Sequence, residues 1–356
     1  MNNSDLHKQS YKELSGDFSD LVLEKTESNF QFSGKGVTSQ LEKIRENIAE
    51  AKATKNGREL LVIMTEQARI WKPTFSEYKE ILDFRAKFHK YSMRNNALIY
   101  MQNPNASYVG SFKHFKDLGY KINKGEHGMF VLAPRKLAMA EVNPGEWKSM
   151  KELTEKQLEA VKNGALKVRD KTYFVNGYVF DISQTDCPSE DLPKLLRGMS
   201  RKINAEEYYD ALKNIVGEYG IGFSEENLKS VTLKGYYIPS EERIVINERI
   251  SLTDKAVVIT HELSHALLHA GNTELSENQI EFEAESTAYI ALKQSGFDMS
   301  DYSFGYIKGY LSNLSPDELQ KALTRIDNCG NLLSEKIGEQ LDISQAIGAA
   351  PELEIC

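Results

Sequence analysis

The chain has 356 residues, of which 40% are hydrophobic and 27% are charged, so it has the composition of a globular protein and the length of two domains. No apolar run approaches the roughly 18 residues that a membrane span needs. The polar N-terminus has the features of neither a secretory signal nor a transit peptide. The three cysteines, Cys187, Cys329 and Cys356, lie far apart and fit no disulfide or zinc-ribbon spacing. We therefore expect a cytoplasmic protein without a membrane partner.

The net charge of −8 is unevenly distributed along the chain. Ten basic and only two acidic residues lie between Arg85 and Lys136, so this segment carries +8 and the remainder −16. A basic block in an acidic chain indicates either a polyanionic partner for that block or an ordinary solvated surface.

The N-terminal half is predicted to contain helices followed by strands. Residues 1–35 are polar and rich in Ser, Asn and Gly, so we expect a flexible tail. Apolar spacing predicts three helices, a short amphipathic segment and a strand, at residues 39–70, 76–90, 94–102, 111–118 and 129–133. Residues 137–171 are charged and weakly patterned, which indicates an inserted excursion before a second strand at 173–182.

The C-terminal half has clearer patterns. They predict a helix at residues 205–219, a hairpin of strands at 230–238 and 243–247, and helices at 253–269, 278–294 and after Ser315. Pro188 and Pro193 mark the boundary between the halves. The prediction is an α+β protein with a mixed α/β domain at 36–187, a second domain at 188–345 and a frayed tail at 346–356.

The strongest chemical signal is the segment His261-Glu262-Leu263-Ser264-His265. Residues four apart lie on one helical face, about 6 Å apart along the axis, so His261 and His265 can both bind one zinc ion. Glu262 is placed to act as the general base that accepts a proton from the zinc-activated water. The alternative is an ordinary amphipathic helix that contains two histidines.

The third zinc ligand is expected on the following helix. Glu281 would complete a His2Glu site with an open coordination position, and Glu285, one turn further on, is the alternative. His269 lies about 12 Å along the helix axis from His261, too far for both to reach one ion. The strand Arg243–Asn247 precedes the motif, where a zincin presents an edge strand to an extended peptide.

The basic block also has features of a single-stranded-DNA-binding surface. Such surfaces combine cations for phosphates with aromatic rings on which bases stack. Phe112 and Phe115 lie in the block, but at least one of them is expected in the core. The residues expected to contact DNA are Tyr91, Arg94, Asn95, Tyr108, Lys113, Lys116, Lys121 and Lys124, although Asn95 could instead bind backbone groups.

Two resemblances support these hypotheses. His261 to His269, with Glu281, Ala284 and Ala288 downstream, resemble the ImmA/IrrE group of intracellular metallopeptidases. The N-terminal half resembles the single-stranded-DNA-binding domain of ArdC-like antirestriction proteins, and the blocks that carry this are 91–99, 102–109, 112–119, 124–128 and 179–185. The combination implies a zincin-like domain attached to a protein of a mobile genetic element that protects incoming single-stranded DNA during conjugation.

Three functional hypotheses remain open. The chain is an antirestriction protein that binds single-stranded DNA and carries a zinc peptidase site, an ImmA-like protease that cleaves a repressor or restriction component, or a DNA-binding module with a structural zinc site. The protein substrate is not predicted. Candidates for stabilising the oxyanion are Tyr289, Tyr302 and Tyr306. The excursion at 137–171 is either a surface insertion or a segment that covers the zinc cleft until DNA binds.

Overall fold

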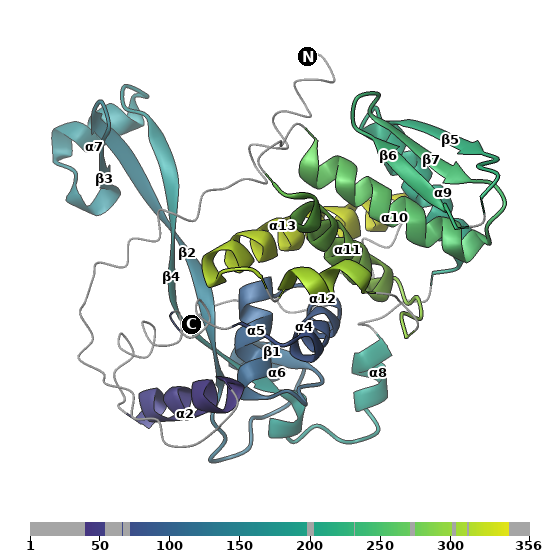
Figure 1. Ribbon diagram of the computed structural model, residues 1–356. Coiled ribbons are helices and arrows are strands. Elements are labelled where there is room, and N and C mark those ends of the chain that lie inside the picture. Colours follow the sequence, from purple (N-terminus) through teal and green to yellow (C-terminus); the bar gives the residue numbers. More distant parts are fainter. Residues whose placement is uncertain are drawn as a thin grey trace.

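The computed structural model describes residues 40–53, 66, 72–197, 203–230, 232–270, 275–300, 304–311 and 313–341 (Figure 1). The tails expected at 1–35 and 346–356 lie outside these residues, as does most of the segment 54–70 of the first predicted helix. Within the described part, no helix is both long and apolar enough to cross a membrane.

The N-terminal half combines short helices with one long antiparallel ladder. Thr74 begins α4 with a capping box that includes Glu77, and Ser92 and Ser111 cap α5 and α6. The elements are α2 (Gln40–Ala53), α4 (Phe75–Lys87), α5 (Met93–Gln102), β1 (Val109–Ser111), α6 (Phe112–Asp117), β2 (Met129–Asn143), β3 (Glu146–Ser149), the 3-10 turn η2 (Met150–Glu152), α7 (Glu155–Lys162), β4 (Val168–Asp181), η3 (Ile182–Gln184) and α8 (Leu192–Arg197). The strand order is β1-β4-β2-β3.

The C-terminal half places helices beside a small sheet of order β5-β7-β6. Its elements are α9 (Ala205–Glu218), β5 (Gly222–Glu226), β6 (Gly235–Ile238), β7 (Arg243–Asn247), α10 (Leu252–His269), α11 (Glu277–Gln294), α12 (Gly305–Leu311) and α13 (Pro316–Gln340). Ser315 and Glu318 form the capping box that begins α13, with Pro316 at its first position. Helices and sheets are mixed in both halves, which confirms the predicted α+β class.

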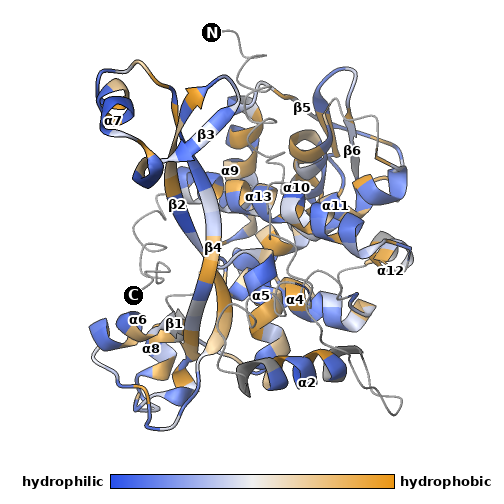
Figure 2. Ribbon diagram, turned by 90° about the vertical axis from the view of Figure 1, so that its left-hand side faces the viewer, coloured by the Kyte–Doolittle hydropathy of each residue, from blue (hydrophilic) through white to orange (hydrophobic). Residues whose placement is uncertain are grey.

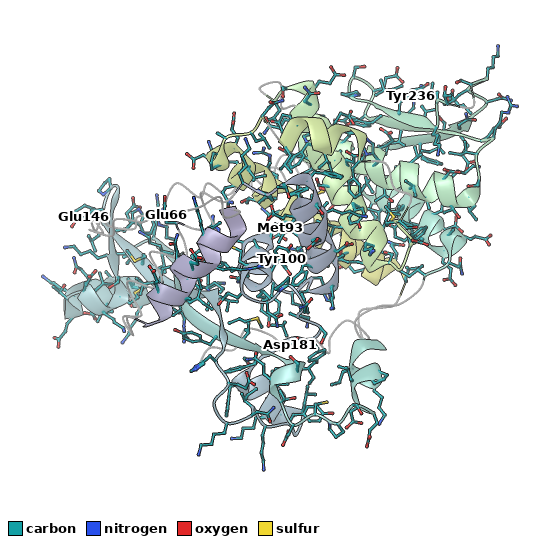
Figure 3. All side chains as sticks on the ribbon, turned by 60° about the horizontal axis from the view of Figure 1, so that its bottom comes forward. Glu66, Met93, Tyr100, Glu146, Asp181 and Tyr236 are labelled. Carbon is teal, nitrogen blue, oxygen red and sulfur yellow. The ribbon has the colours of Figure 1, made fainter. Side chains whose placement is uncertain are left out.

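The two halves share one hydrophobic core. Helix α4 of the N-terminal half packs against α11, where the Tyr78 hydroxyl donates a hydrogen bond to Ser286 Oγ at 2.9 Å. Arg85 of α4 is fully buried and pairs with Asp327 of α13. Buried residues from α4, α5, α10, α11 and α13 form one continuous cluster, and Figure 3 shows Met93 and Tyr100 of α5 inside the molecule. The halves distinguished in the sequence therefore pack as one body.

Helix α5 covers the edge of β2 with two side-chain amides. Asn95 donates to the carbonyl of Leu132 at 2.9 Å and accepts from the Leu132 N–H at 2.8 Å. Gln102 makes the same pair of bonds with Phe130. Because the two amides satisfy the backbone groups of this edge, β2 needs no further strand there.

The segment 137–171, predicted as a weakly patterned inserted excursion, is regularly structured. Strands β2 and β4 continue their ladder in register from Met129↔Val179 to Ala140↔Val168, and β3 and α7 lie at its far end. Residues 134–173 thus form a β-ribbon arm, which Figure 1 shows projecting away from α10 and α11. In Figure 2 the ladder is hydrophobic where α5 contacts it and more hydrophilic along the arm. The arm therefore does not cover α10, the helix that carries His261 and His265.

Candidate metal centre and nucleic-acid surface

Helices α10 and α11 bring His261, His265 and Glu281 together. The Nε2 atoms of the two histidines lie 3.0 Å apart. Oε2 of Glu281 is 3.3 Å from His261 Nε2, and its Oε1 is 3.4 Å from His265 Nε2. Among the described residues, this is the group of three or more possible ligand side chains that converges closely enough for one metal ion.

The spacing of these atoms fits a divalent metal. Ligand atoms about 2.0–2.1 Å from a tetrahedral zinc ion lie about 3.3 Å from one another. The observed separations of 3.0, 3.3 and 3.4 Å have this size. Two imidazoles and one carboxylate are also ligands that zinc and related transition metals accept, whereas Mg2+ and Ca2+ prefer oxygen alone.

The electrostatics of the site are those of a charged cluster in a largely buried position. Burial would raise the pKa of Glu281, but its interactions with His261 and His265 outweigh burial and lower this pKa. Burial would lower the pKa of His261, yet the neighbouring carboxylates of Glu281 and Glu262 raise it. The carboxylate of Glu281 is therefore held in its anionic, ligating form.

Glu262 is buried beside the histidines, but Glu281 lies closer to both imidazoles than Glu262 does. The Glu262 carboxylate accepts a hydrogen bond from the backbone N–H of Tyr237 in β6. Burial raises the pKa of Glu262, although the two histidines oppose this. A carboxyl group with a raised pKa can both accept and return a proton, as a general base requires.

The sheet edge beside the motif is β6, not the strand expected from the sequence. Arg243–Asn247 forms β7, which lies between β5 and β6 and so has both edges paired. Strand β6 contacts α10. A Cβ atom on Gly235 would come within 2.6 Å of Val258 Cγ1 and 2.7 Å of the Val245 carbonyl oxygen. Only glycine therefore lets β6 approach α10 this closely.

The alternative ligands have other partners. Glu285 accepts a hydrogen bond from the backbone N–H of Ile307 at 3.2 Å, at the start of α12. His269 Nε2 lies 3.4 Å from Glu283, whose carboxylate also binds the guanidinium of Arg325. This buried network joins α10, α11 and α13 next to the three converging side chains, and nothing in the sequence motif indicated it.

The tyrosines considered for the oxyanion receive no support. The hydroxyl of Tyr289 donates to Asp83 of α4 at 2.7 Å, and its ring is fully buried in the shared core. Tyr302 and the side chain of Tyr306 lie outside the described residues.

Three of the side chains expected to contact DNA are buried, and a fourth, Arg94, is half-buried. Tyr91 is 4% exposed and its hydroxyl donates to the Val109 carbonyl. Tyr108 is 6% exposed, and its hydroxyl is hydrogen-bonded to the His114 ring. The Asn95 amide is hydrogen-bonded to the backbone of Leu132 in β2. Arg94 is half-buried, and burial lowers its pKa. The rings of Tyr91 and Tyr108 and the amide of Asn95 are therefore not exposed for contact with DNA in this structure.

The four lysines lie on the surface around α6. Lys113 and Lys116 are exposed on α6, and Lys121 and Lys124 are exposed in the turn that follows. The ring of Phe112, on the same helix as Lys113 and Lys116, is 59% exposed, whereas Phe115 is fully buried. The sequence could not distinguish these two phenylalanines, because residues three apart share a helical face. We call Phe112 and the four lysines the α6 surface.

Known proteins match both halves. Residues 58–180 match the N-terminal domain of anti-restriction factor ArdC, and residues 216–308 match the IrrE N-terminal-like domain of the M78 peptidase family. The uncharacterized Bacillus anthracis protein pXO2-81 is 36% identical over 290 residues, which cover 73% of this chain and 48% of that protein. The chain thus spans about half the length of this curated relative.

Two crystal structures of the antirestriction protein ArdC from the R388 plasmid are also similar, each at 15% identity. The metal-free form has a TM-score of 0.44 and covers 70% of this chain and 85% of its own. The Mn(II)-bound form has a TM-score of 0.41, with coverages of 73% and 97%. On the evidence of these two matches, the chain combines an ArdC-type N-terminal domain with an IrrE-type domain of the M78 peptidase family, as the sequence resemblances predicted.

Proposed function

We propose that this protein is a zinc-dependent endopeptidase that also binds single-stranded DNA, and that it acts in the cytoplasm for a mobile genetic element as an antirestriction factor. The observation that carries the peptidase proposal is the convergence of His261, His265 and Glu281 with Glu262 beside a sheet edge. The matched ArdC and IrrE-like domains support the pairing of the two activities.

Each residue of the site has a defined role in peptide hydrolysis. A zinc ion held by His261, His265 and Glu281 would supply a Lewis acid that polarises the peptide carbonyl and acidifies water. Glu262 accepts the proton of the attacking water and returns it to the leaving amine. The backbone N–H of Tyr237 orients the Glu262 carboxylate for this transfer.

The edge of β6 is suited to holding an extended peptide. In an edge strand, backbone N–H and C=O groups on the outer side can pair with a further chain. Residues of β6 lie beside α10, so a peptide added there runs past Glu262. This arrangement favours an extended or unfolded protein segment as the substrate.

The test of the peptidase proposal is cleavage of an unfolded protein such as reduced casein by the full-length chain loaded with zinc. Glu262→Gln provides the inactive variant, because it removes the base while keeping the three proposed ligands. An unfolded substrate is chosen because β6 offers hydrogen bonds only to a chain without secondary structure of its own.

The α6 surface is proposed to contact the phosphates of single-stranded DNA. Four exposed lysines and the exposed ring of Phe112 combine the two features that such binding needs. The affinity of such a surface falls with salt, because each neutralised phosphate releases counterions.

Reversing two of these charges should weaken DNA binding. We expect Lys113→Glu with Lys116→Glu to lower the affinity for oligothymidylate at least about tenfold at low salt and to reduce the salt slope by about 1.4, since each lost phosphate contact removes about 0.7. Fluorescence anisotropy of the full-length protein measures both quantities. Lys43→Glu with Lys321→Glu is the control, because these exposed residues change the net charge equally. Equal weakening by both pairs would reject the α6 surface.

A further inference from the structure

The register of the arm places basic and aromatic side chains on one face. Arg135 pairs directly with Tyr173, Leu137 with Lys171, and Met139 with Arg169. Paired residues of antiparallel strands share a face, and alternate residues of one strand share it too. Tyr173, Lys171 and Arg169 therefore form a row about 14 Å long beside Arg135, since alternate residues lie about 6.8 Å apart.

The row is open to solvent and continues to the tip of the arm. Tyr173 is 43% exposed, and Arg135, Arg169 and Lys171 are exposed. The guanidinium of Arg169 lies 4.1 Å from the ring centre of Trp147 on β3, in a cation–π contact. We call these five residues, Arg135, Trp147, Arg169, Lys171 and Tyr173, the ribbon face.

The opposite face of the arm has a different character. Lys136 lies 3.9 Å from Asp170, so its charge is partly balanced. Ala140 is fully buried where η2 contacts β2. Three basic side chains and the exposed ring of Tyr173 thus lie together on the ribbon face, whereas Lys136 on the opposite face lies beside Asp170.

We propose that the ribbon face is a second contact surface for single-stranded nucleic acid, with Tyr173 stacking on a base and Arg135, Lys171 and Arg169 binding phosphates. This inference rests on the proposed DNA-binding function and assigns it a surface that the sequence did not indicate. A single strand is favoured over a duplex, because an exposed ring between cations offers stacking to unpaired bases. Both surfaces belong to one sheet: β1 and α6 lie at one end of β4 and the ribbon face at the other.

The position of the arm agrees with this role. Figure 3 shows Glu146 near the arm's tip and Tyr236 on the C-terminal sheet at opposite sides of the molecule. A strand bound along the ribbon face would leave the β6 edge and Glu262 accessible to a protein substrate. The two proposed ligands therefore do not compete for one surface.

The test compares the two faces of the arm in the full-length protein. We expect Arg135→Ala with Lys171→Ala to reduce the salt slope of oligothymidylate binding by about 1.4. Tyr173→Ala should weaken binding about tenfold, whereas Tyr173→Phe should preserve it, because stacking needs the ring and not the hydroxyl. The matched control is Lys136→Ala with Lys148→Ala, which removes two charges from the opposite face.

The outcomes separate this inference from the proposed function. Failure of the unaltered protein to bind the oligonucleotide would overturn both DNA proposals. A second outcome would overturn the ribbon-face proposal alone. In that outcome the α6 substitutions weaken binding, but substitutions on either face of the arm leave it unchanged. Competition by duplex DNA as effective as that by the single strand would also contradict it.

Discussion

Replacing Glu262 with Gln should abolish cleavage of an unfolded protein substrate while leaving bound zinc in place. General acid–base groups contribute about 10²–10⁴-fold to rate, so a loss of about a thousandfold is expected. The amide oxygen can still accept the N–H of Tyr237, so the fold of the site should be retained. Gel analysis of the substrate over time, with the metal content measured on the same sample, gives both quantities.

Glu277→Gln provides the matched control for this substitution, because Glu277 is exposed in the first turn of α11. It makes the same chemical change near the site and should leave the rate unaltered. A Glu262→Gln protein that cleaves as fast as the unaltered one would show that the carboxylate is not the base. If neither the unaltered protein nor Glu262→Gln cleaves the substrate, a structural metal site would be favoured.

The second large effect concerns stability. Arg85→Met would leave Asp327 as an uncompensated charge in the shared core, where Asp327 also accepts the Met93 N–H at 3.0 Å. Breaking a buried ion pair in this way costs about 3–5 kcal/mol. We expect the free energy of unfolding in urea to fall by this amount. Since α4 and α13 come from different halves, both halves should unfold in one transition.

Two further variants test whether the pair itself is responsible. Asp327→Asn keeps an acceptor for Met93 but removes the charge, so the double variant Arg85→Met with Asp327→Asn should lose less than the sum of the single losses. Lys194→Met removes the exposed partner of Asp191 and should leave the free energy of unfolding nearly unchanged. Two separate unfolding transitions, one for each half, would contradict the shared core.

Local features of the fold and the site were predictable from the sequence. The spacing of His261 and His265 fixes a common helical face whatever surrounds the helix. The caps Ser92, Ser111 and Ser315 act on the backbone N–H groups three residues further on, so short-range patterns suffice for them. The sequence could not decide between Glu281 and Glu285 as the third ligand, because that depends on how α10 and α11 pack. It did restrict the candidates to two residues on one face of α11.

Features that depend on distant residues were not predictable. Tyr91 and Tyr108 lie among basic residues in the sequence, yet both rings are buried. Tyr91 belongs to the main hydrophobic core, and Tyr108 packs with Phe115 and Ile182. The order β5-β7-β6 depends on a parallel pair between β5 and β7, which no local signal reveals. The strands of the arm were not predicted, because both of its faces are largely solvated and its sequence therefore lacks a hydrophobic alternation.

The metal content of purified protein, measured by inductively coupled plasma mass spectrometry, tests the central claim most directly. His261, His265 and Glu281 are proposed as the complete set of protein ligands, so the full-length chain should hold about one zinc ion. Glu281→Ala should lose it, whereas Glu285→Gln and His269→Gln should retain it, because these side chains bind Ile307 and Glu283 instead. Retention of zinc in Glu281→Ala, with loss in Glu285→Gln or His269→Gln, would contradict the account.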